Sequence, residues 1–328
     1  MARSVAIIGA GQIGFAAARV FLAKGWNVRV LARSRPQWLA PEMRFESYNL
    51  GETTVPQADV VLDSIAFDAE DAARYDPEAV GRLIVVSSAS VYCDGEGRTL
   101  DEAAQNGFPE FDGPIAEDQT TIAHGPDTYS TRKVRMENTA RELFGDRATI
   151  LRPCAIYGPH CRHPREWWFA KRLIDGRTQI PLALNGESRF QTSAADAIGR
   201  FAEFASDRGL GGVYNIADAD APCVLEIGHT IAEIWGADAQ FVPVDGYPDG
   251  AVGRTPWSVP APYLVSNEKA RAAGFEGSER YAESANEAIL ALKNDPPQDW
   301  RAAFPQLAAY PWDMFDYEAE DRFFDERH

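Results

Sequence analysis

The feature that most constrains the fold is a short apolar run followed at once by a glycine-rich turn. Val5–Ile8 reads as a strand, Gly9–Gly14 has the pattern Gly-x-Gly-x-x-Gly, and a helical pattern follows directly. In such a turn Gly9 permits a sharp reversal, Gly11 lets the backbone approach a pyrophosphate, and Gly14 lets the helix pack on the strand. The helix N-terminus then presents unpaired N–H groups to the phosphates. We therefore expect a dinucleotide to contact Gly9, Gly11, Gln12, Ile13 and Gly14.

Composition narrows the class of protein. The chain has 328 residues, 45% of them hydrophobic, and a formal net charge of −17. This content favours a sizeable core over disorder, and the negative charge disfavours nucleic acid or an anionic membrane as a partner. Four cysteines without paired spacing fit a reduced, cytoplasmic protein. The immediate entry into a strand argues against a signal peptide, and no apolar run reaches the length of a membrane span.

The end of the second expected strand bears on the choice of cofactor. Trp26–Leu31 reads as this strand, and it is followed by Ala32 and by the basic residues Arg33 and Arg35. Dinucleotide folds that prefer NAD usually place an acid here for the ribose hydroxyls, whereas an arginine can pair with a 2′-phosphate. We therefore expect NADP, with NAD still open, because an ordinary exposed basic turn would look the same.

Further apolar runs predict a doubly wound parallel sheet, in an α/β fold of the Rossmann type. Strands are expected at 44–50, 59–65, 82–86 and 148–151, and the nearly continuous apolar run at 59–65 is typical of a buried parallel strand. The link from Phe67 to Gly81 has only about fifteen residues, close to the minimum for a parallel crossover. Residues 92–127 read as a long loop over the carboxyl edge of the sheet, where ligands bind in such folds.

The second half of the chain predicts a smaller mixed α/β lobe. We expect helices at 127–143, 166–174, 225–235, 266–273 and 282–293, strands at 213–216 and 240–244, and a loop and helix within 189–205. Residues 1–158 would form the dinucleotide-binding domain, with 189–217 returning to it. Residues 159–188 and 218–294 would form the substrate-binding lobe. The tail 295–328 is rich in aromatic and acidic residues, and we expect it to pack on the body or on a partner subunit because aromatic rings bury large areas.

A tyrosine and a lysine at helical spacing carry the expected chemistry. Tyr129 and Lys133 lie at i and i+4, and hence on one face of a helix. An ammonium beside a phenol lowers the phenol pKa and can also hold ribose hydroxyls, and the tyrosine can then exchange a proton with a carbinol or carbonyl. Ser88 ends a central strand and could hydrogen-bond the same substrate oxygen. A surface Tyr–Lys pair and a serine that merely caps the strand exit are the alternatives.

These motifs, in this order, resemble the short-chain dehydrogenase/reductase superfamily, in its extended branch of NAD(P)-dependent epimerases, dehydratases and reductases. The resemblance covers residues 5 to about 216 and continues weakly through 266–270. Its motifs are Gly9–Gly14, Val85–Tyr92, Tyr129 with Lys133, Leu151–Pro153, Tyr157–Pro159, Arg189, Ala195–Asp196 and Tyr214–Ile216.

The resemblance implies a catalytic triad of Ser88, Tyr129 and Lys133, and it places Asn49 near the adenine. We also expect substrate contacts at the cleft, and further cofactor contacts at the strand ends. The expected additional cofactor contacts are Ser64, Ala66, Ser87, Pro153, Ala155 and Ile156. The expected substrate contacts are Ser90, Tyr92, His160, Arg189 and Arg254.

Departures from the family pattern bear on the expected reaction, the class of substrate and the oligomeric state. Ile8 stands where the first glycine of the family's turn is usual. The Thr-Asp-Glu of dehydratases is replaced by Ser88–Ser90, which disfavours dehydration. Ala155 replaces the asparagine that nucleotide-sugar enzymes use at the diphosphate, so a nucleotide sugar is possible but not favoured. The short link after Phe67 lacks room for the long helix of the usual dimer interface, so we expect a monomer or a non-standard homodimer.

Residues 160–168 permit two other interpretations. His160, Cys161 and His163 contain metal-binding groups, but two histidines and a thiol within four residues rarely form a site without other ligands, so we expect no metal. The two histidines are better explained as lining of the substrate cleft. Trp167 and Trp168 could form an aromatic wall of that cleft or part of the core.

The sequence thus predicts an enzyme that acts on a small molecule. The first hypothesis is an NAD(P)-dependent oxidoreductase that transfers hydride to or from a carbonyl or alcohol carbon. The first alternative is a sugar or nucleotide-sugar epimerase, which runs the same chemistry out and back. The second alternative is a dinucleotide-binding sensor without catalysis.

Overall fold

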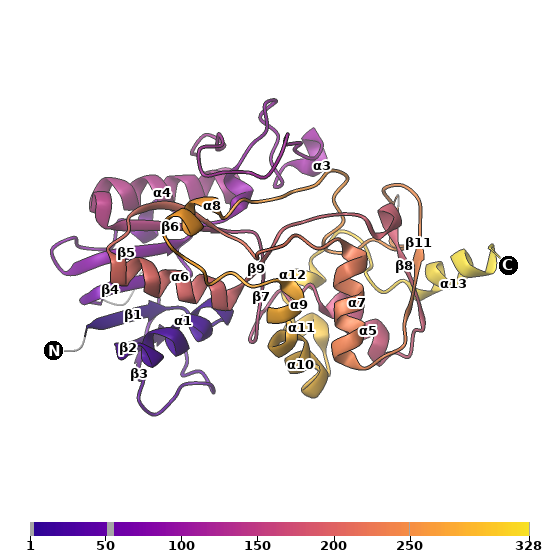
Figure 1. Ribbon diagram of the computed structural model, residues 1–328, viewed down its shortest axis with the longest axis horizontal. Coiled ribbons are helices and arrows are strands. Elements are labelled where there is room, and N and C mark those ends of the chain that lie inside the picture. The colour runs from indigo at the N-terminus through magenta and orange to yellow at the C-terminus, as the bar shows by residue number, and fades with distance from the viewer. Residues whose placement is uncertain (1–2, 51–55, 249, 328) are drawn as a thin grey trace.

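A seven-stranded parallel sheet forms the first lobe of the computed structural model, which describes residues 3–50, 56–248 and 250–327 (Figure 1). The strand order is β10-β6-β5-β4-β1-β2-β3, and each neighbouring pair is parallel. The predicted doubly wound sheet is therefore confirmed. The strands are β1 (Ser4–Ile8), β2 (Asn27–Ala32), β3 (Arg44–Ser47), β4 (Ala58–Asp63), β5 (Val80–Val86), β6 (Ala148–Pro153) and β10 (Gly212–Ile216).

Side chains alternate between the two faces of this sheet, so both faces need a cover of helices. Helices α1 (Gln12–Ala23) and α6 (Ala195–Arg208) cover one face, where Ile7, Leu62 and Val86 belong to the same apolar cluster as Phe21 and Phe201. On the other face, the cluster joins strand residues to Met136, Ala140 and Phe144 of α4 (Tyr129–Phe144). Figure 1 shows α4 on one side of the strands and α1 with α6 on the other.

The link between β4 and β5 is short, as the sequence predicts. Among the described residues, it contains only α2 (Ala69–Ala72), which begins with the capping aspartate Asp68. Asp68 also lies within 3.2 Å of the Arg135 guanidinium on α4. The link therefore contains no long helix.

The second lobe contains a two-stranded parallel pair and several helices (Figure 1). Its elements are α5 (Trp167–Ile174), β8 (Gln179–Leu182), α7 (Val224–Trp235), β11 (Gln240–Pro243), α9 (Tyr281–Ser284) and α10 (Asn286–Asn294). The helix expected at 282–293 is thus divided, and the helix expected at 266–273 is the short α8 (Glu268–Ala272). Trp167 and Trp168 are buried in the core, so they do not form an exposed aromatic wall.

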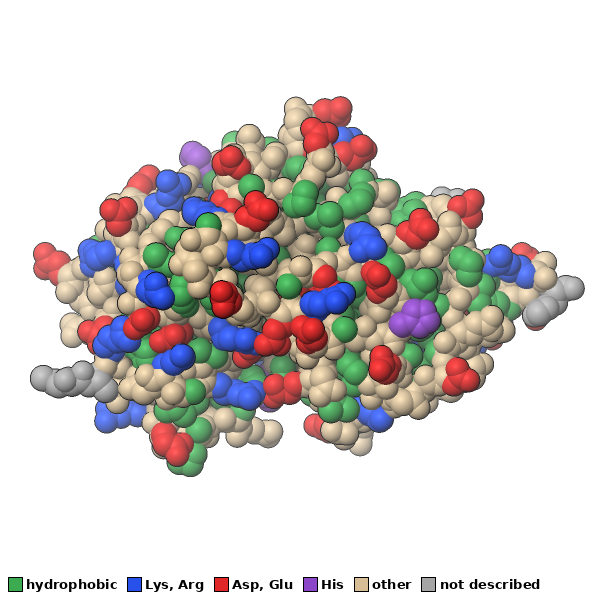
Figure 2. All heavy atoms as spheres, in the orientation of Figure 1, with side chains coloured by type: hydrophobic (Ala, Val, Ile, Leu, Met, Phe, Trp, Pro, Cys, Tyr) green, Lys and Arg blue, Asp and Glu red, His purple; other side chains and the backbone are tan. Residues whose placement is uncertain are grey.

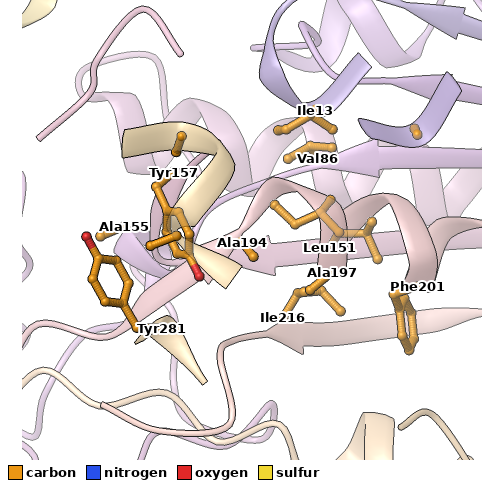
Figure 3. Packing of buried hydrophobic residues seen from close by; sticks show 14 of the residues in the cluster. Ile13, Val86, Leu151, Ala155, Tyr157, Ala194, Ala197, Phe201, Ile216 and Tyr281 are labelled. Atoms are coloured by element: carbon orange, nitrogen blue, oxygen red, sulfur yellow. The ribbon is translucent and has the colours of Figure 1, made fainter. Parts of the chain in front are cut away.

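A small second pair of strands joins the two lobes. It consists of β7 (Ala155–Tyr157) and β9 (Thr192–Ala194), which pair in parallel. The ring of Tyr157 packs edge-on against Tyr281 of the second lobe, with centroids 4.9 Å apart. Figure 3 shows these two rings beside Ala155 and Ala194, at one end of the apolar cluster that continues to Phe201.

The C-terminal tail packs against the second lobe. It contains α11 (Trp300–Ala303), α12 (Pro305–Ala308) and α13 (Tyr317–Asp325), and Figure 1 shows its end at the extremity opposite the N-terminus. Arg172 of α5 reaches the tail, where its guanidinium forms an ion pair of 2.5 Å with Glu320. The two side chains are 1% and 2% exposed, so the pair is buried.

The surface carries charges of both signs among scattered apolar side chains, as the face in Figure 2 shows. No helix in the described part of the chain combines the length and the apolar character needed to cross a bilayer.

Candidate active site

The glycine turn forms an open cradle between β1 and α1. Gly9 has φ of +106°, and a Cβ there would lie 2.3 Å from the Ser64 hydroxyl oxygen. A Cβ on Gly14 would lie 1.9 Å from the Gly9 carbonyl oxygen, whereas a Cβ on Gly11 would meet nothing within 4 Å. Gly9 and Gly14 are therefore required by the protein itself, and the space at Gly11 is available to a ligand.

The N-terminus of α1 fits a pyrophosphate. Gly11 is the N-cap residue and has no side chain to satisfy the first-turn N–H groups. Gln12, the first helical residue, has a buried side-chain oxygen without a hydrogen-bond partner among the described residues. The open space at Gly11 and the uncapped N–H groups of α1 leave this end of the helix available to the phosphates of a dinucleotide.

The residues expected at the adenosine end lie beyond β2 and β3. Arg33 and Arg35 follow β2 and are exposed, and neither forms an ion pair within the described ranges. Asn49 follows β3 after the buried Tyr48. Both arginines are therefore accessible to a ligand phosphate.

Ser88 and Tyr129 come together at the carboxyl end of the sheet. Ser88 follows β5, and its hydroxyl accepts a hydrogen bond of 3.1 Å from the Ser90 N–H at the start of η1 (Ala89–Val91). Tyr129 is the first residue of α4, whose N-cap Thr128 forms a capping box with Thr131. Both residues line the same cavity, and the Ser88 hydroxyl lowers the pKa of the Tyr129 phenol. The strand end and the helix start thus place two hydroxyls at one point.

Lys133 lies one helical turn further along α4. Its ammonium donates to the carbonyl oxygens of Ala66 at 2.6 Å and Val86 at 2.9 Å, and lies 5.6 Å from the centre of the Tyr129 ring. Burial lowers its pKa to about 8, and the nearby carboxylates of Asp63 and Glu137 oppose this shift. An ammonium has three N–H donors, so one remains for a ligand hydroxyl beyond the two carbonyls.

The phenol of Tyr129 differs from the sequence-based expectation. Although the residue is 43% exposed where it borders the cavity, loss of hydration around the hydroxyl raises its pKa to about 12. The charge of Asp101 raises the pKa further, and the Ser88 hydroxyl lowers it. The expected lowering by Lys133 is wrong for this structure, because the ammonium is directed at two backbone carbonyls. Tyr129 is therefore a protonated donor at neutral pH.

The strand end beneath these residues is held by a buried charge network. Ser87 donates a 2.5 Å hydrogen bond to Glu137 of α4, and Arg152 of β6 donates to both oxygens of the same carboxylate. Ala66, whose carbonyl accepts from Lys133, follows a turn in which its N–H donates to the buried carboxylate of Asp63. These bonds fix the backbone groups that orient Lys133.

A cavity of about 550 Å³ lies over Ser88 and Tyr129 and reaches the first residue of α1. Its floor comes from the first lobe, and its far wall comes from the second lobe and from the C-terminal tail. The lining residues are Gln12, Ser87, Ser88, Ser90, Leu100, Asp101, Tyr129, Pro153, Cys154, Ile156, His163, Arg165, Phe190, Gln306 and Tyr310.

Four of the residues expected to bind substrate do not line this cavity. Tyr92 is fully buried and donates to Asn215, and His160 packs against Phe15 on the outer side of α1. Arg189 donates to the carbonyl of Ala221 and lies 3.5 Å from Glu226. Arg254 stacks on Trp312 of the tail, 3.9 Å from the ring centre. Of the expected substrate contacts, Ser90 lies in the cavity.

Several lining residues escaped the sequence analysis. Arg165 follows the short β7 strand and shows no motif, and Phe190 lies directly after Arg189. Gln306 and Tyr310 belong to the tail, whose aromatic content predicted packing but not a place in the site. Tyr310 lies 3.1 Å from the His163 ring nitrogen, which joins the tail to the cavity wall.

The cysteines and histidines form no metal centre in the described ranges. No group of three or more His, Cys, Asp or Glu side chains is arranged to hold a metal ion there. All four cysteines are free thiols. Cys154 lines the cavity, but burial raises its pKa to about 12, so it is protonated and a poor nucleophile.

Comparison with solved structures supports the fold but not a specific activity. The UDP-N-acetylglucosamine 4-epimerase from Bacillus cereus matches 89% of this chain and all of its own length, with a TM-score of 0.64 and 15% identity. The UDP-glucose 4-epimerase from Thermotoga maritima, solved with UDP-glucose, matches 89% of this chain and 99% of its own, with a TM-score of 0.63 and 17% identity.

The dTDP-glucose 4,6-dehydratase from Streptomyces venezuelae, solved with NAD, matches 93% of this chain and 99% of its own, with a TM-score of 0.64 and 19% identity. No family model and no curated protein matches the sequence. At these identities the likeness establishes the fold alone, and it confirms the fold that the resemblance to extended short-chain dehydrogenases/reductases implies.

Proposed function

We propose that this chain, with the fold of the extended short-chain dehydrogenases/reductases, is an NAD(P)-dependent oxidoreductase acting on a carbonyl or alcohol of a small molecule. The observation that carries the proposal is the meeting of Ser88, Tyr129 and Gln12 around one cavity, with Lys133 beneath Tyr129. The same cavity therefore joins the expected proton donor to the helix N-terminus expected to hold the cofactor.

Each residue has a distinct role in carbonyl reduction. A reduced nicotinamide would supply hydride to the carbonyl carbon. Tyr129, protonated at neutral pH because its pKa is raised to about 12, donates the proton that the oxygen then requires. Ser88 donates a hydrogen bond to that oxygen and orients it. Lys133 offers its remaining N–H to a ribose hydroxyl and places positive charge below the phenol.

An epimerase is the second candidate, because solved structures of this fold include sugar-nucleotide 4-epimerases. The positions of Arg189 and Arg254 weigh against a nucleotide-sugar substrate, since neither side chain lines the cavity. A reductase consumes cofactor with every turnover, whereas an epimerase recycles it. Loss of absorbance at 340 nm in proportion to product would support the oxidoreductase.

Replacement of the proton donor tests catalysis directly. Tyr129→Phe removes the hydroxyl, and we expect turnover to fall by at least about 100-fold, the contribution typical of a positioned acid. Cofactor binding, measured by fluorescence titration, should persist in the variant. The sensor alternative predicts that cellular function survives this change, and retained activity would exclude Tyr129 as the donor.

We further propose NADP as the preferred cofactor. Arg33 and Arg35 are exposed after β2 and could both approach a 2′-phosphate. Arg33→Ala should weaken NADP binding by about tenfold or more, in line with loss of a charge-assisted hydrogen bond, and leave NAD binding unchanged. Arg322→Ala, at an exposed position of α13 in the C-terminal tail, serves as the control. Tighter binding of NAD by the native chain, with no effect of Arg33→Ala, would contradict this assignment.

A further inference from the structure

Arg165 is a cation without a partner in the wall of the cavity. It follows Pro164 at the entry to the second lobe, and it lines the same space as Tyr129 and Ser88. Its Nε is buried and has no hydrogen-bond partner. Within the described ranges, its guanidinium forms no hydrogen bond and no ion pair.

The two arginines that are buried as whole residues in the described part of the chain, Arg152 and Arg172, are satisfied. Arg152 binds both oxygens of Glu137, and Arg172 binds Glu320 and two backbone carbonyls. Arg254 also has a buried Nε without a hydrogen bond, but its guanidinium stacks on Trp312. A guanidinium removed from water loses hydration free energy, and charged groups in proteins normally recover it through a partner. The vacant donors of Arg165 therefore indicate that its partner is a ligand.

The neighbours of Arg165 do not neutralise it. The face of Phe190 lies 5.7 Å from its guanidinium carbon. Asp101 is the acidic residue among the lining side chains, and its carboxylate accepts a 2.6 Å hydrogen bond from the Ser130 N–H at the start of α4. Burial and the charge of Arg165 lower the pKa of His163 to about 3, so this imidazole is neutral. The adjacent Glu166 is directed toward Tyr281 instead.

We propose that Arg165 binds an anionic group, a carboxylate or a phosphate, of the substrate whose carbonyl or carbinol meets Tyr129. This inference rests on the proposed function and specifies its substrate class as a small hydroxy or oxo compound with a negative charge. A guanidinium fork matches the planar oxygens of either group. Gln306 and Tyr310 of the tail lie in the same cavity and supply further polar contacts to such a ligand.

Equilibrium binding of simple anions tests the site without the true substrate. Malonate and inorganic phosphate are titrated separately into the native chain by calorimetry, at constant ionic strength and with NADP present or absent. We expect at least one of the two to bind with one site per chain. Tight binding of malonate alone would identify a carboxylate, and tight binding of phosphate alone would identify a phosphate ester.

Two variants assign the binding to Arg165. Arg165→Gln should weaken binding of the anion by about tenfold or more, which is the effect of losing one charge-assisted hydrogen bond. Arg165→Lys should weaken this binding less. Arg162→Gln removes an exposed arginine three residues away that does not line the cavity, so its affinity should equal that of the native chain. The inference would be overturned if Arg165→Gln bound the anion as tightly as the native chain does. It would also be overturned if the native chain bound neither anion.

Failure of this inference and failure of the proposed function are distinguishable. Binding of NADP with no effect of Arg165→Gln on the anion would refute the anion site and leave the oxidoreductase standing. Anion binding that depends on Arg165, in a chain that binds neither NADP nor NAD, would refute the oxidoreductase instead. Circular dichroism of Arg165→Gln and Arg165→Lys establishes that both variants are folded.

Discussion

At the scale of single residues, burial affects the protonation of Tyr129 and Lys133 more strongly than the neighbouring charges do. The sequence predicts that the Lys133 ammonium lowers the pKa of the Tyr129 phenol. Instead, loss of hydration raises the pKa of Tyr129 and lowers the pKa of Lys133, and both shifts favour the neutral side chain. The Tyr129 phenol therefore stays protonated over the whole neutral range. The positive charge of Lys133 is lost above about pH 8.

A neighbouring buried acid gives a prediction about stability. Glu166 is 2% exposed, and burial raises its pKa from 4.5 to about 7. The folded state thus binds the proton more tightly than the unfolded state, so its stabilising contribution is complete below pH 4.5 and is lost as pH rises through 7. We expect the free energy of unfolding, relative to that of Glu166→Gln, to fall by roughly 3 kcal/mol between pH 4.5 and 8.

Urea denaturation of both chains across this pH range measures the difference. Glu42→Gln, at an exposed position, is the matched control and should follow the native chain at every pH. A constant difference between native chain and Glu166→Gln from pH 4.5 to 8 would contradict the buried, raised-pKa carboxyl.

Residue identities at the site were only partly accessible from sequence. Ser88 and Tyr129 could be paired because a strand end and a helix start meet at the carboxyl edge of a parallel sheet. The sequence could not place Arg165, Gln306 and Tyr310 in the site. These residues reach the cavity only because the second lobe and the tail fold back over the sheet. Arg189 and Arg254 were misplaced for the same reason, since each finds its partner within those distant segments.

At the scale of elements, Gly14 is required for the fold, whereas Gly11 leaves space for a ligand. Gly14→Ala would force a Cβ to within 1.9 Å of the Gly9 carbonyl, so we expect α1 to shift and the chain to lose a few kcal/mol of stability. Gly11→Ala meets open space and an extended backbone with φ of −81°, so stability should be unchanged within about 0.5 kcal/mol.

Both Gly14→Ala and Gly11→Ala should weaken cofactor binding, but for different reasons. Gly14→Ala acts by shifting α1. Gly11→Ala fills the space expected to receive the pyrophosphate, so NADP binding should weaken by about tenfold or more although the fold is intact. Thermal denaturation and fluorescence titration of the two variants measure the two effects separately. A Gly11→Ala protein that binds NADP like the native chain would show that the cradle holds no pyrophosphate.

The long strands were predictable, and of the short strands only β3 and β11 were, because each lies within a longer predicted run. Strands β1, β2, β4, β5 and β6 have runs of apolar residues that identify buried parallel strands. Strands β7, β8 and β9 have only three or four residues each, too few for periodicity to reveal them. Strands β7 and β9 form the joint between the lobes, so the sequence predicted the sheet far better than the cavity above it.

At the scale of the whole molecule, the buried pair Arg172–Glu320 attaches the tail to the second lobe. Glu320→Ala leaves a buried guanidinium without its carboxylate, and we expect a loss of about 3–5 kcal/mol of stability. Glu326→Ala, at an exposed position of the same segment, should cost less than about 0.5 kcal/mol. Denaturant unfolding of both variants measures the contrast.

The double variant Arg172→Met with Glu320→Leu separates charge from packing. Because it removes both charges together, it should recover most of the stability lost in Glu320→Ala. A double variant no more stable than Glu320→Ala would show that shape, rather than the unpaired charge, causes the loss.

The place of Gln306 and Tyr310 in the cavity wall has a consequence for biosynthesis. The glycine cradle and the Ser88–Tyr129 pair lie between residues 9 and 129, but Gln306 and Tyr310 complete the wall opposite them. A ribosome must therefore synthesise the chain through Tyr310 before the wall of the cavity can be complete. Nascent chains, and fragments from interrupted translation, could hold a dinucleotide and still be unable to enclose a substrate.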